Sequence, residues 1–331
     1  MADWWTELDD HIVEVRCQPD GALVAAAVAS GPVTLLDGET GRVERVLPGH
    51  RVGTSSVAWH PKGAILATAG QDGQTRLWDV GTGLGIATFS SGSAWVERLS
   101  WNPSGSALAV AAGRHITLLS ERGAPVETWS NHLSTVTDIA WSPDGTSLAA
   151  TSYGGVTLWV AGGPDGRRQL AWPGSSLAVA WRPDGRCLAT GDQDSTVHFW
   201  VVEAGDHLQM SGYETKVRDL AWDASGRYLA TGGGPELTVW DCRPPGPSGS
   251  RPIVVTGGDT AVTAITAHGG YFAFGCEAGC VAIARAGSSF AAGKAAVGDG
   301  VSALMFRDEG RRLLVGSETG TLMSLGVHEP S

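Results

Sequence analysis

The sequence contains little charge, and most of that charge is negative. Only 17% of its 331 residues are charged, and only three of its 23 basic residues are lysines. With 34 acidic residues the formal net charge is −11. Proteins that bind nucleic acids depend on a basic surface. The composition therefore argues against a nucleic-acid partner.

Long apolar runs are also missing. None approaches the roughly 18 residues that a membrane-spanning helix needs, and the acidic N-terminus MADWWTELDDHIVEV lacks the apolar core of a secretory signal. There are only five cysteines, mostly in apolar surroundings. These features predict a cytoplasmic protein with no membrane partner, in which most thiols pack as small core side chains.

Stretches without glycine or proline are rare. The chain has 47 Gly and 16 Pro, and only residues 1–18 and 126–142 run longer than about fifteen residues without either. Inside a helix each would cost about 1 or 3 kcal/mol. Because 42% of the residues are nevertheless hydrophobic, we expect a large core built from many short strands joined by tight turns.

A repeat runs along the whole chain. Its clearest copies are VAWHPKGAILATAGQDGQTRLWDV (57–80), IAWSPDGTSLAATSYGGVTLWV (139–160), VAWRPDGRCLATGDQDSTVHFWVV (179–202) and LAWDASGRYLATGGGPELTVWDC (220–242). In each copy an anchor aromatic precedes a polar turn, an apolar strand, a Gly-rich turn and a strand that ends in Trp. Anchors fall near residues 17, 59, 101, 141, 181, 222, 265 and 306.

This period and motif resemble the WD40 repeat family, in which each unit is a four-stranded propeller blade of about 40–45 residues. The resemblance covers residues 1–331 as one propeller. It implies an all-β, closed β-propeller of the WD40 type, and the repeat count predicts eight four-stranded blades. The alternative is seven, with the eroded unit at 257–296 as a loop or insertion.

The two ends of the chain predict how the ring closes. Trp5 lies twelve residues before anchor Cys17, the same spacing that separates Trp129 from anchor Trp141. We therefore interpret segment 3–8 as the outermost strand of a blade whose other strands do not precede it in the sequence. The last unit, 301–327, has only three strands. We expect the N-terminal strand to complete this last blade and so remove an exposed sheet edge.

The resemblance also implies a buried hydrogen-bonded network in the blade with the fullest motif. Its members are His50, Thr68, Asp72 and Trp78. A buried carboxylate must be paired and hydrogen-bonded, so we interpret this group as structural and not as a catalytic triad. No catalytic motif occurs in the sequence. We expect neither an enzyme nor a cofactor.

One cluster could bind a metal. Cys276 and Cys280 flank a hairpin turn in the seventh repeat, and His268 lies nearby in the sequence. A Cys-x3-Cys pair with a histidine is within the range that zinc sites use. Two small strand residues in an eroded blade are the simpler interpretation, so these three residues are metal-ligand candidates only.

Exposed aromatic and basic residues are candidates for binding a partner. In propellers of this type the loops before the first strand and between the second and third strands share one face. Loops of these two kinds contain Trp95, Tyr153, Tyr213, Arg51, Lys216 and Arg218. Tryptophan, tyrosine and arginine are the residues most enriched at binding hot spots.

The sequence therefore favours a monomeric, non-catalytic scaffold that presents one face of a rigid propeller to one or more partner proteins. The acidic pI of about 5.2 favours a partner with basic residues. Two alternatives remain open. One is a metal-handling accessory protein that uses the seventh repeat, and the other is an enzyme or small-ligand binder at the mouth of the channel.

Overall fold

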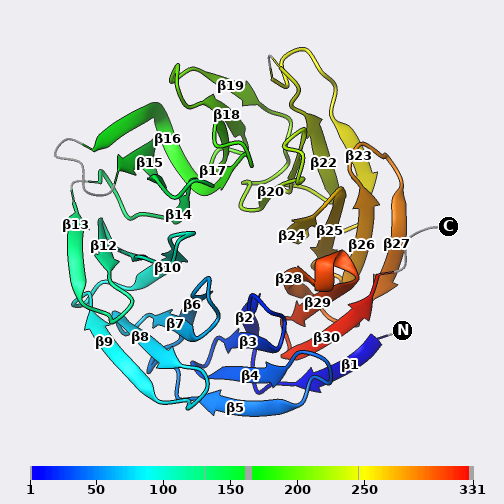
Figure 1. The fold of residues 1–331 in the computed structure, drawn as a ribbon. Coiled ribbons are helices and arrows are strands. Elements are labelled where there is room, and N and C mark those ends of the chain that lie inside the picture. Colours follow the sequence, from blue (N-terminus) through cyan, green and yellow to red (C-terminus); the bar gives the residue numbers. More distant parts are fainter. Residues whose placement is uncertain (1, 131, 161–165, 245, 328–331) are drawn as a thin grey trace.

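The chain forms a ring of antiparallel β-sheets around a central channel (Figure 1). This computed structural model describes residues 2–130, 132–160, 166–244 and 246–327. Within these ranges every regular element is a strand apart from one short 3-10 helix, η1 (Asp308–Gly310), in agreement with the all-β prediction. None of the described elements is a helix long and apolar enough to span a membrane.

The strands follow the sequence repeats. The first repeat forms β2 (Ile12–Cys17), β3 (Leu23–Val28), β4 (Val33–Asp37) and β5 (Val43–Leu47). The second forms β6 (Thr54–Trp59), β7 (Ile65–Gly70), β8 (Gln74–Asp79) and β9 (Gly85–Ser90), and the third forms β10 (Val96–Trp101), β11 (Leu108–Ala112), β12 (His115–Leu119) and β13 (Pro125–Trp129). The fourth and fifth together form β14 (Asp138–Trp141), β15 (Ser147–Val160), β16 (Arg167–Trp181), β17 (Cys187–Asp192), β18 (Val197–Val201) and β19 (His207–Met210).

The remaining repeats complete the ring. The sixth forms β20 (Leu220–Trp222), β21 (Tyr228–Thr231), β22 (Glu236–Asp241) and β23 (Ile253–Thr256). The seventh forms β24 (Val262–His268), β25 (Tyr271–Cys276), β26 (Cys280–Arg285) and β27 (Ala291–Ala296). The eighth forms β28 (Val301–Arg307), β29 (Arg312–Ser317) and β30 (Thr321–Gly326), which join β1 (Ala2–Glu7).

Eight repeats thus give seven hydrogen-bonded sheets, six with four strands and one with six. The prediction of eight separate four-stranded blades was therefore wrong, and seven is the observed number. The reason differs from the one expected, because the eroded unit at 257–296 forms a complete four-stranded sheet, β24–β27. All eight repeats still contribute strands to the ring.

The two merged repeats share one sheet because β15 and β16 are long strands that change partner along their length. β14 pairs with the first part of β15, and residues Tyr153–Trp159 of β15 pair with β16. The second part of β16 then pairs with β17. Gly154 and Gly155, where β15 changes partner, have φ of 97° and 99°, values that side chains other than glycine rarely adopt.

The N-terminal strand closes the ring, as the sequence predicted. β1 pairs antiparallel with β30, with Trp5 opposite Met323 and Glu7 opposite Thr321. The indole of Trp4 donates a hydrogen bond of 3.1 Å to the carbonyl oxygen of Gly38 in the first repeat. Figure 1 shows β1 and β30 side by side in the last sheet.

The anchor tryptophans connect neighbouring repeats. Each indole N–H donates to a backbone carbonyl of the preceding repeat, over distances of 2.9–3.2 Å. The five donors are Trp59, Trp101, Trp141, Trp181 and Trp222. The regular spacing of the anchors is therefore the spacing of these inter-repeat contacts.

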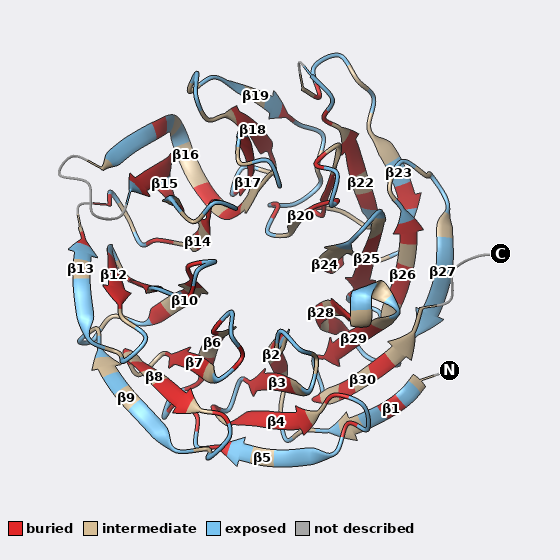
Figure 2. Ribbon diagram, in the orientation of Figure 1, coloured by how far each residue is buried: buried red, intermediate tan, exposed pale blue. Residues whose placement is uncertain are grey.

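The core lies between adjacent sheets. The middle strands of each sheet are largely buried and the innermost strands partly buried, whereas the outermost strands are mostly exposed (Figure 2). One cluster combines Trp129, Trp141 and Trp159 across the third and fourth repeats. Packing between sheets thus holds the loops at either end of the strands in fixed positions.

Candidate interaction surface

Two sets of loops lie together at one face of the ring, which we call the loop face. In most repeats the residue after the second strand donates a backbone hydrogen bond to the loop before the first strand, as from Gln71 to Gly53 (3.0 Å) and from Glu318 to Gly300 (2.8 Å). The same loops also bond to the preceding repeat, as from Val136 to Gly113 (2.8 Å). The loop face is therefore a continuous, hydrogen-bonded surface.

Three large apolar side chains are exposed on the loop face of the third and fourth repeats. Trp95 is 54% exposed, Leu133 63% and Tyr153 50%. The N–H of Tyr153 donates to Ser134 Oγ over 2.9 Å, which brings Tyr153 beside Leu133. We call Trp95, Leu133 and Tyr153 the apolar arc. Sequence reasoning missed Leu133, because its repeat offers no signal that this position is uncovered.

The basic candidates Arg51, Lys216 and Arg218 are all exposed on loops of this face. None of them forms an ion pair with another described residue. Arg51 is fixed through its backbone N–H, which donates to Asp72 Oδ2 over 3.2 Å. Their guanidinium and ammonium groups are available to a ligand.

Tyr213 has a structural role that the sequence did not reveal. Its hydroxyl interacts with Thr231 Oγ1 and accepts a hydrogen bond from Trp240 Nε1, both at 2.8 Å, and burial raises its pKa to about 12. Tyr213 lies nine residues before anchor Trp222, as His50 does before Trp59. It therefore takes the place of the network histidine, and the expectation that it is a surface aromatic needs correction.

The network of the second repeat is formed in the structure. His50 Nδ1 lies 2.8 Å from Asp72 Oδ1, His50 Nε2 lies 3.0 Å from Thr68 Oγ1, and Trp78 Nε1 donates to Thr68 Oγ1 over 3.0 Å. Burial lowers the pKa of His50. Burial opposes ionisation of Asp72, but hydrogen bonds from His50, Arg51 and Gln74 keep its pKa below the usual value. A neutral histidine thus bridges a carboxylate and a hydroxyl.

In other repeats a different arrangement occupies the position of His50, nine residues before the anchor. In the fourth repeat Trp159 Nε1 donates directly to His132 Nε2 over 3.1 Å. In the fifth, Trp172 occupies this position and its ring lies 4.6 Å from that of His198. His198 Nδ1 lies 2.7 Å from Asp192 Oδ2, and both side chains are fully buried. This pair was missed, because His198 reads in the sequence as an ordinary polar position.

Exposed carboxylates gather on the loop face of the seventh, eighth and first repeats. Asp9, Asp259, Glu277, Asp299 and Glu318 are all exposed, and none forms an ion pair within the described ranges. A Cβ at Gly300 would lie 2.8 Å from Glu318 Oε2 and 2.9 Å from the carbonyl of Glu277, so these loops are adjacent. We call these five residues the acidic patch.

The central channel encloses about 720 Å³ and is lined by the first strands of all eight repeats. Glu14, Arg98, Asp138 and Asp219 project charged groups into it. Asp138 pairs with Arg98 at 3.4 Å and accepts a hydrogen bond from Val179 N–H at 3.0 Å. Burial raises the pKa of Asp219 to about 6, against the attraction of Arg98 and Arg218 and with some repulsion from Asp138.

We expect Asp219→Asn to stabilise the protein above pH 6. The folded-state pKa of about 6 lies above the unfolded value of 3.8, so ionisation of Asp219 costs stability as the pH rises from about 4 to 6. Removing that charge should increase the free energy of unfolding by about 1–3 kcal/mol at pH 7.5. Thermal melts at pH 7.5 and pH 4.0 test this. An equal shift at both pH values, or none at pH 7.5, would contradict it.

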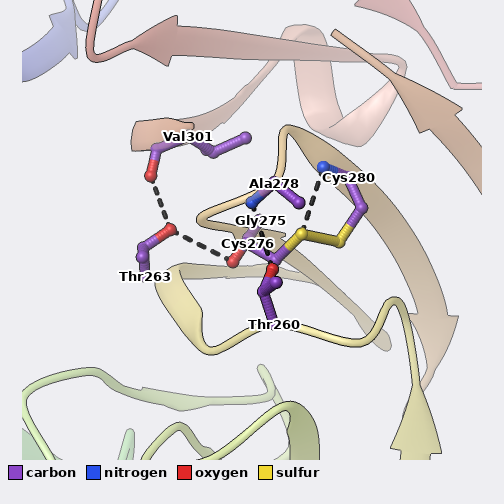
Figure 3. The surroundings of a disulfide bond; sticks show 7 residues. All are labelled: Thr260, Thr263, Gly275, Cys276, Ala278, Cys280 and Val301. Carbon is purple, nitrogen blue, oxygen red and sulfur yellow. Dashed lines mark hydrogen bonds between the residues drawn. A yellow bond between two sulfur atoms is a disulfide. The ribbon is translucent and has the colours of Figure 1, made fainter. Parts of the chain in front are cut away.

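The candidate metal ligands do not converge. Cys276 and Cys280 are joined by a disulfide across the β25–β26 turn (Figure 3), where Thr260 Oγ1 accepts a hydrogen bond from Ala278 N–H. His268 pairs with Tyr271 at the other end of β25, about 16 Å away at 3.3 Å per residue. No group of three suitable side chains is found among the described residues. The three candidates therefore do not form a shared metal site in this structure.

The remaining cysteines differ from this pair. Cys187 and Cys242 are free and buried, as expected of core thiols, and Cys17 is free and half-buried. Burial raises the pKa of Cys17 to about 11 and that of Cys242 to about 12. These thiols are therefore poor nucleophiles at neutral pH.

Comparison with known proteins agrees with this architecture. The WD40 model, described as WD domain, G-beta repeat, matches residues 41–79, 123–159, 171–201 and 207–241. These four segments contain the repeats that end in Trp78, Trp159, Trp200 and Trp240. No curated protein sequence is significantly similar to the chain.

Solved structures resemble the whole ring. The computationally designed protein Ika8 superposes with a TM-score of 0.84 at 17% identity, over 98% of this chain and 99% of its own. Sqt1 from Chaetomium thermophilum superposes with a TM-score of 0.85 at 16% identity, over 99% of this chain and 100% of its own. At these identities the likeness concerns the fold alone. The chain is thus a β-propeller that contains four recognisable WD40 repeats.

Proposed function

We propose that the protein is a non-catalytic platform that binds a partner protein on its loop face. The observation that carries this proposal is the apolar arc of Trp95, Leu133 and Tyr153, each at least half exposed. Monomeric proteins rarely leave large apolar side chains together on the surface without a partner to cover them. Propellers of WD40 repeats generally serve as scaffolds for protein interactions.

The acidic patch supports a partner that carries lysine or arginine. Its five carboxylates have no ion pair among the described residues, and the loops that hold them contain neither Lys nor Arg. A basic segment lying across the seventh, eighth and first repeats would neutralise this charge. The apolar arc lies on the third and fourth repeats, so one partner would contact the loop face on both sides of the channel mouth.

We expect Trp95→Ala to reduce capture of the partner at least tenfold. A tryptophan at the centre of an interface contributes about 2 kcal/mol or more when truncated. The measurement is a quantitative pull-down from host lysate with wild-type and variant protein, read by mass spectrometry. The matched control is Trp5→Ala, because Trp5 is 64% exposed but lies on the outermost strand β1, away from the loop face.

Salt dependence separates the two parts of the proposal. If a basic segment lies on the acidic patch, the captured amount should also fall as the salt concentration rises, since exposed charges are screened. A partner that is retained by Trp95→Ala, or lost equally with Trp5→Ala, would remove the apolar arc from the interface. A partner whose capture does not change with salt would remove the acidic patch.

A further inference from the structure

A groove on the side of the ring is separate from the loop face. It encloses about 500 Å³ between strands β26 and β27 of the seventh repeat and β29 and β30 of the eighth. Its apolar lining consists of Tyr271, Val281, Ile283, Phe306, Leu313 and Leu325. A volume of this size and an apolar lining are typical of small-ligand sites.

The groove exists because β27 lacks a large apolar side chain that most of the other outer strands have. Six of them place a buried or half-buried apolar residue opposite the start of the third strand, and it packs against the next repeat. These residues are Leu47, Phe89, Trp129, Leu170, Met210 and Val255. In β27 the same position, opposite Val281, is Ala295, which is exposed.

β27 is also exposed along its length (Figure 2). A side-chain-sized space between two otherwise well-packed sheets is unusual, because protein interiors are close-packed. An aliphatic group from a ligand could occupy the volume that Leu47 or Trp129 fills elsewhere in the ring.

The rim of the groove carries one cation on the side of the eighth repeat. Arg311 lines the groove and forms no ion pair with a described residue. Its Nε donates to the carbonyl of Asp308 over 3.0 Å, which fixes the guanidinium while its terminal nitrogens stay available. His268 and Glu309 complete the rim. Lys294 pairs with Ala282, and its side chain points to the face of β27 opposite to that of Ala295.

We propose that this groove binds a small amphipathic anion, namely an aliphatic chain that ends in a carboxylate. The chain would fill the space beside Ala295, and the carboxylate would lie on the guanidinium of Arg311. A guanidinium group forms charge-assisted hydrogen bonds with a carboxylate, while burial of the chain provides the apolar contribution. The proposal is independent of the protein partner, because the groove lies on different residues from the apolar arc.

Decanoate, at concentrations below those at which it forms micelles, is a suitable probe. We expect isothermal titration of the full chain to show saturable binding of one equivalent, and decyltrimethylammonium, which has the same chain and the opposite charge, to bind at least tenfold more weakly. Ala295→Leu should weaken decanoate binding at least tenfold and raise the melting temperature, because the new side chain fills the groove. Arg311→Ala should weaken binding at least tenfold without that rise.

Ala296→Leu is the matched control. It adds the same volume to the next residue of β27, whose side chain points to the opposite face of the strand, so decanoate binding should remain. The proposal is overturned if decanoate does not bind saturably. It is also overturned if the ammonium detergent binds equally well, or if Ala295→Leu binds as the wild type does.

Discussion

Deletion of residues 1–7 should lower the melting temperature by about 10 °C, the largest effect that we expect from any local change. β1 fills the outer edge of the last sheet, and Trp4 is only 7% exposed there. Loss of a buried tryptophan side chain typically lowers the free energy of unfolding by about 3–5 kcal/mol. The deletion also removes the ion pair between Asp3 and Arg312 at 3.2 Å. It leaves the edge of β30 unpaired.

An unpaired edge strand pairs readily with another chain. We therefore expect the truncated protein to associate in a concentration-dependent manner, as measured by size-exclusion chromatography with light scattering. Trp4→Ala should reproduce most of the thermal destabilisation but keep the edge covered. Trp5→Ala, which removes an exposed ring of the same strand, should leave the melting temperature unchanged. A truncated protein that melts and elutes like the full chain would show that β1 does not close the ring.

Thr68→Val should destabilise the protein by about 2–4 kcal/mol. The substitution keeps the shape of the side chain but removes the hydroxyl that lies between His50 and Trp78 at 3.0 Å from each. Both partners are buried, so His50 Nε2 and Trp78 Nε1 would each lose a hydrogen bond in the interior. A buried polar group left unpaired costs about 1–3 kcal/mol. Chemical denaturation followed by tryptophan fluorescence measures the difference.

Thr75→Val is a matched control within the same sheet. Thr75 is 1% exposed, and its hydroxyl has no hydrogen-bond partner among the described residues. The same replacement there removes an unpaired polar atom and should be neutral or stabilising. Equal destabilisation by the two variants would mean that loss of the hydroxyl as such, and not the network, determines the effect.

The sequence by itself determined the repeat and its consequences. The anchors recur because each indole must reach a carbonyl of the preceding repeat, and that requirement is local and periodic. The pairing of segment 3–8 with the last unit followed from the same spacing, since Trp5 stands where Trp129 stands before Trp141. Fold class and ring closure were therefore predictable from one chain.

Features that depend on neighbouring repeats were not predictable. The merging of the fourth and fifth repeats depends on how β15 and β16 exchange partners, which a repeat count does not contain. Tyr213 looked like a surface aromatic, because only the assembled sheet shows that its hydroxyl bonds Thr231 and Trp240. Similarly, His268 is near Cys276 in the sequence but at the other end of the hairpin in space.

The two surfaces with the clearest consequences also depend on the tertiary structure. The acidic patch combines loops from both ends of the chain, because ring closure brings the loop around Asp9 against Gly320, two residues after Glu318. The side groove lies beside Ala295. This alanine carries no signal in the sequence, and only the packing against the eighth repeat shows that its small side chain leaves a space. A periodic sequence fixes what each repeat forms. The contacts between repeats decide which side chains are covered and which remain available to bind.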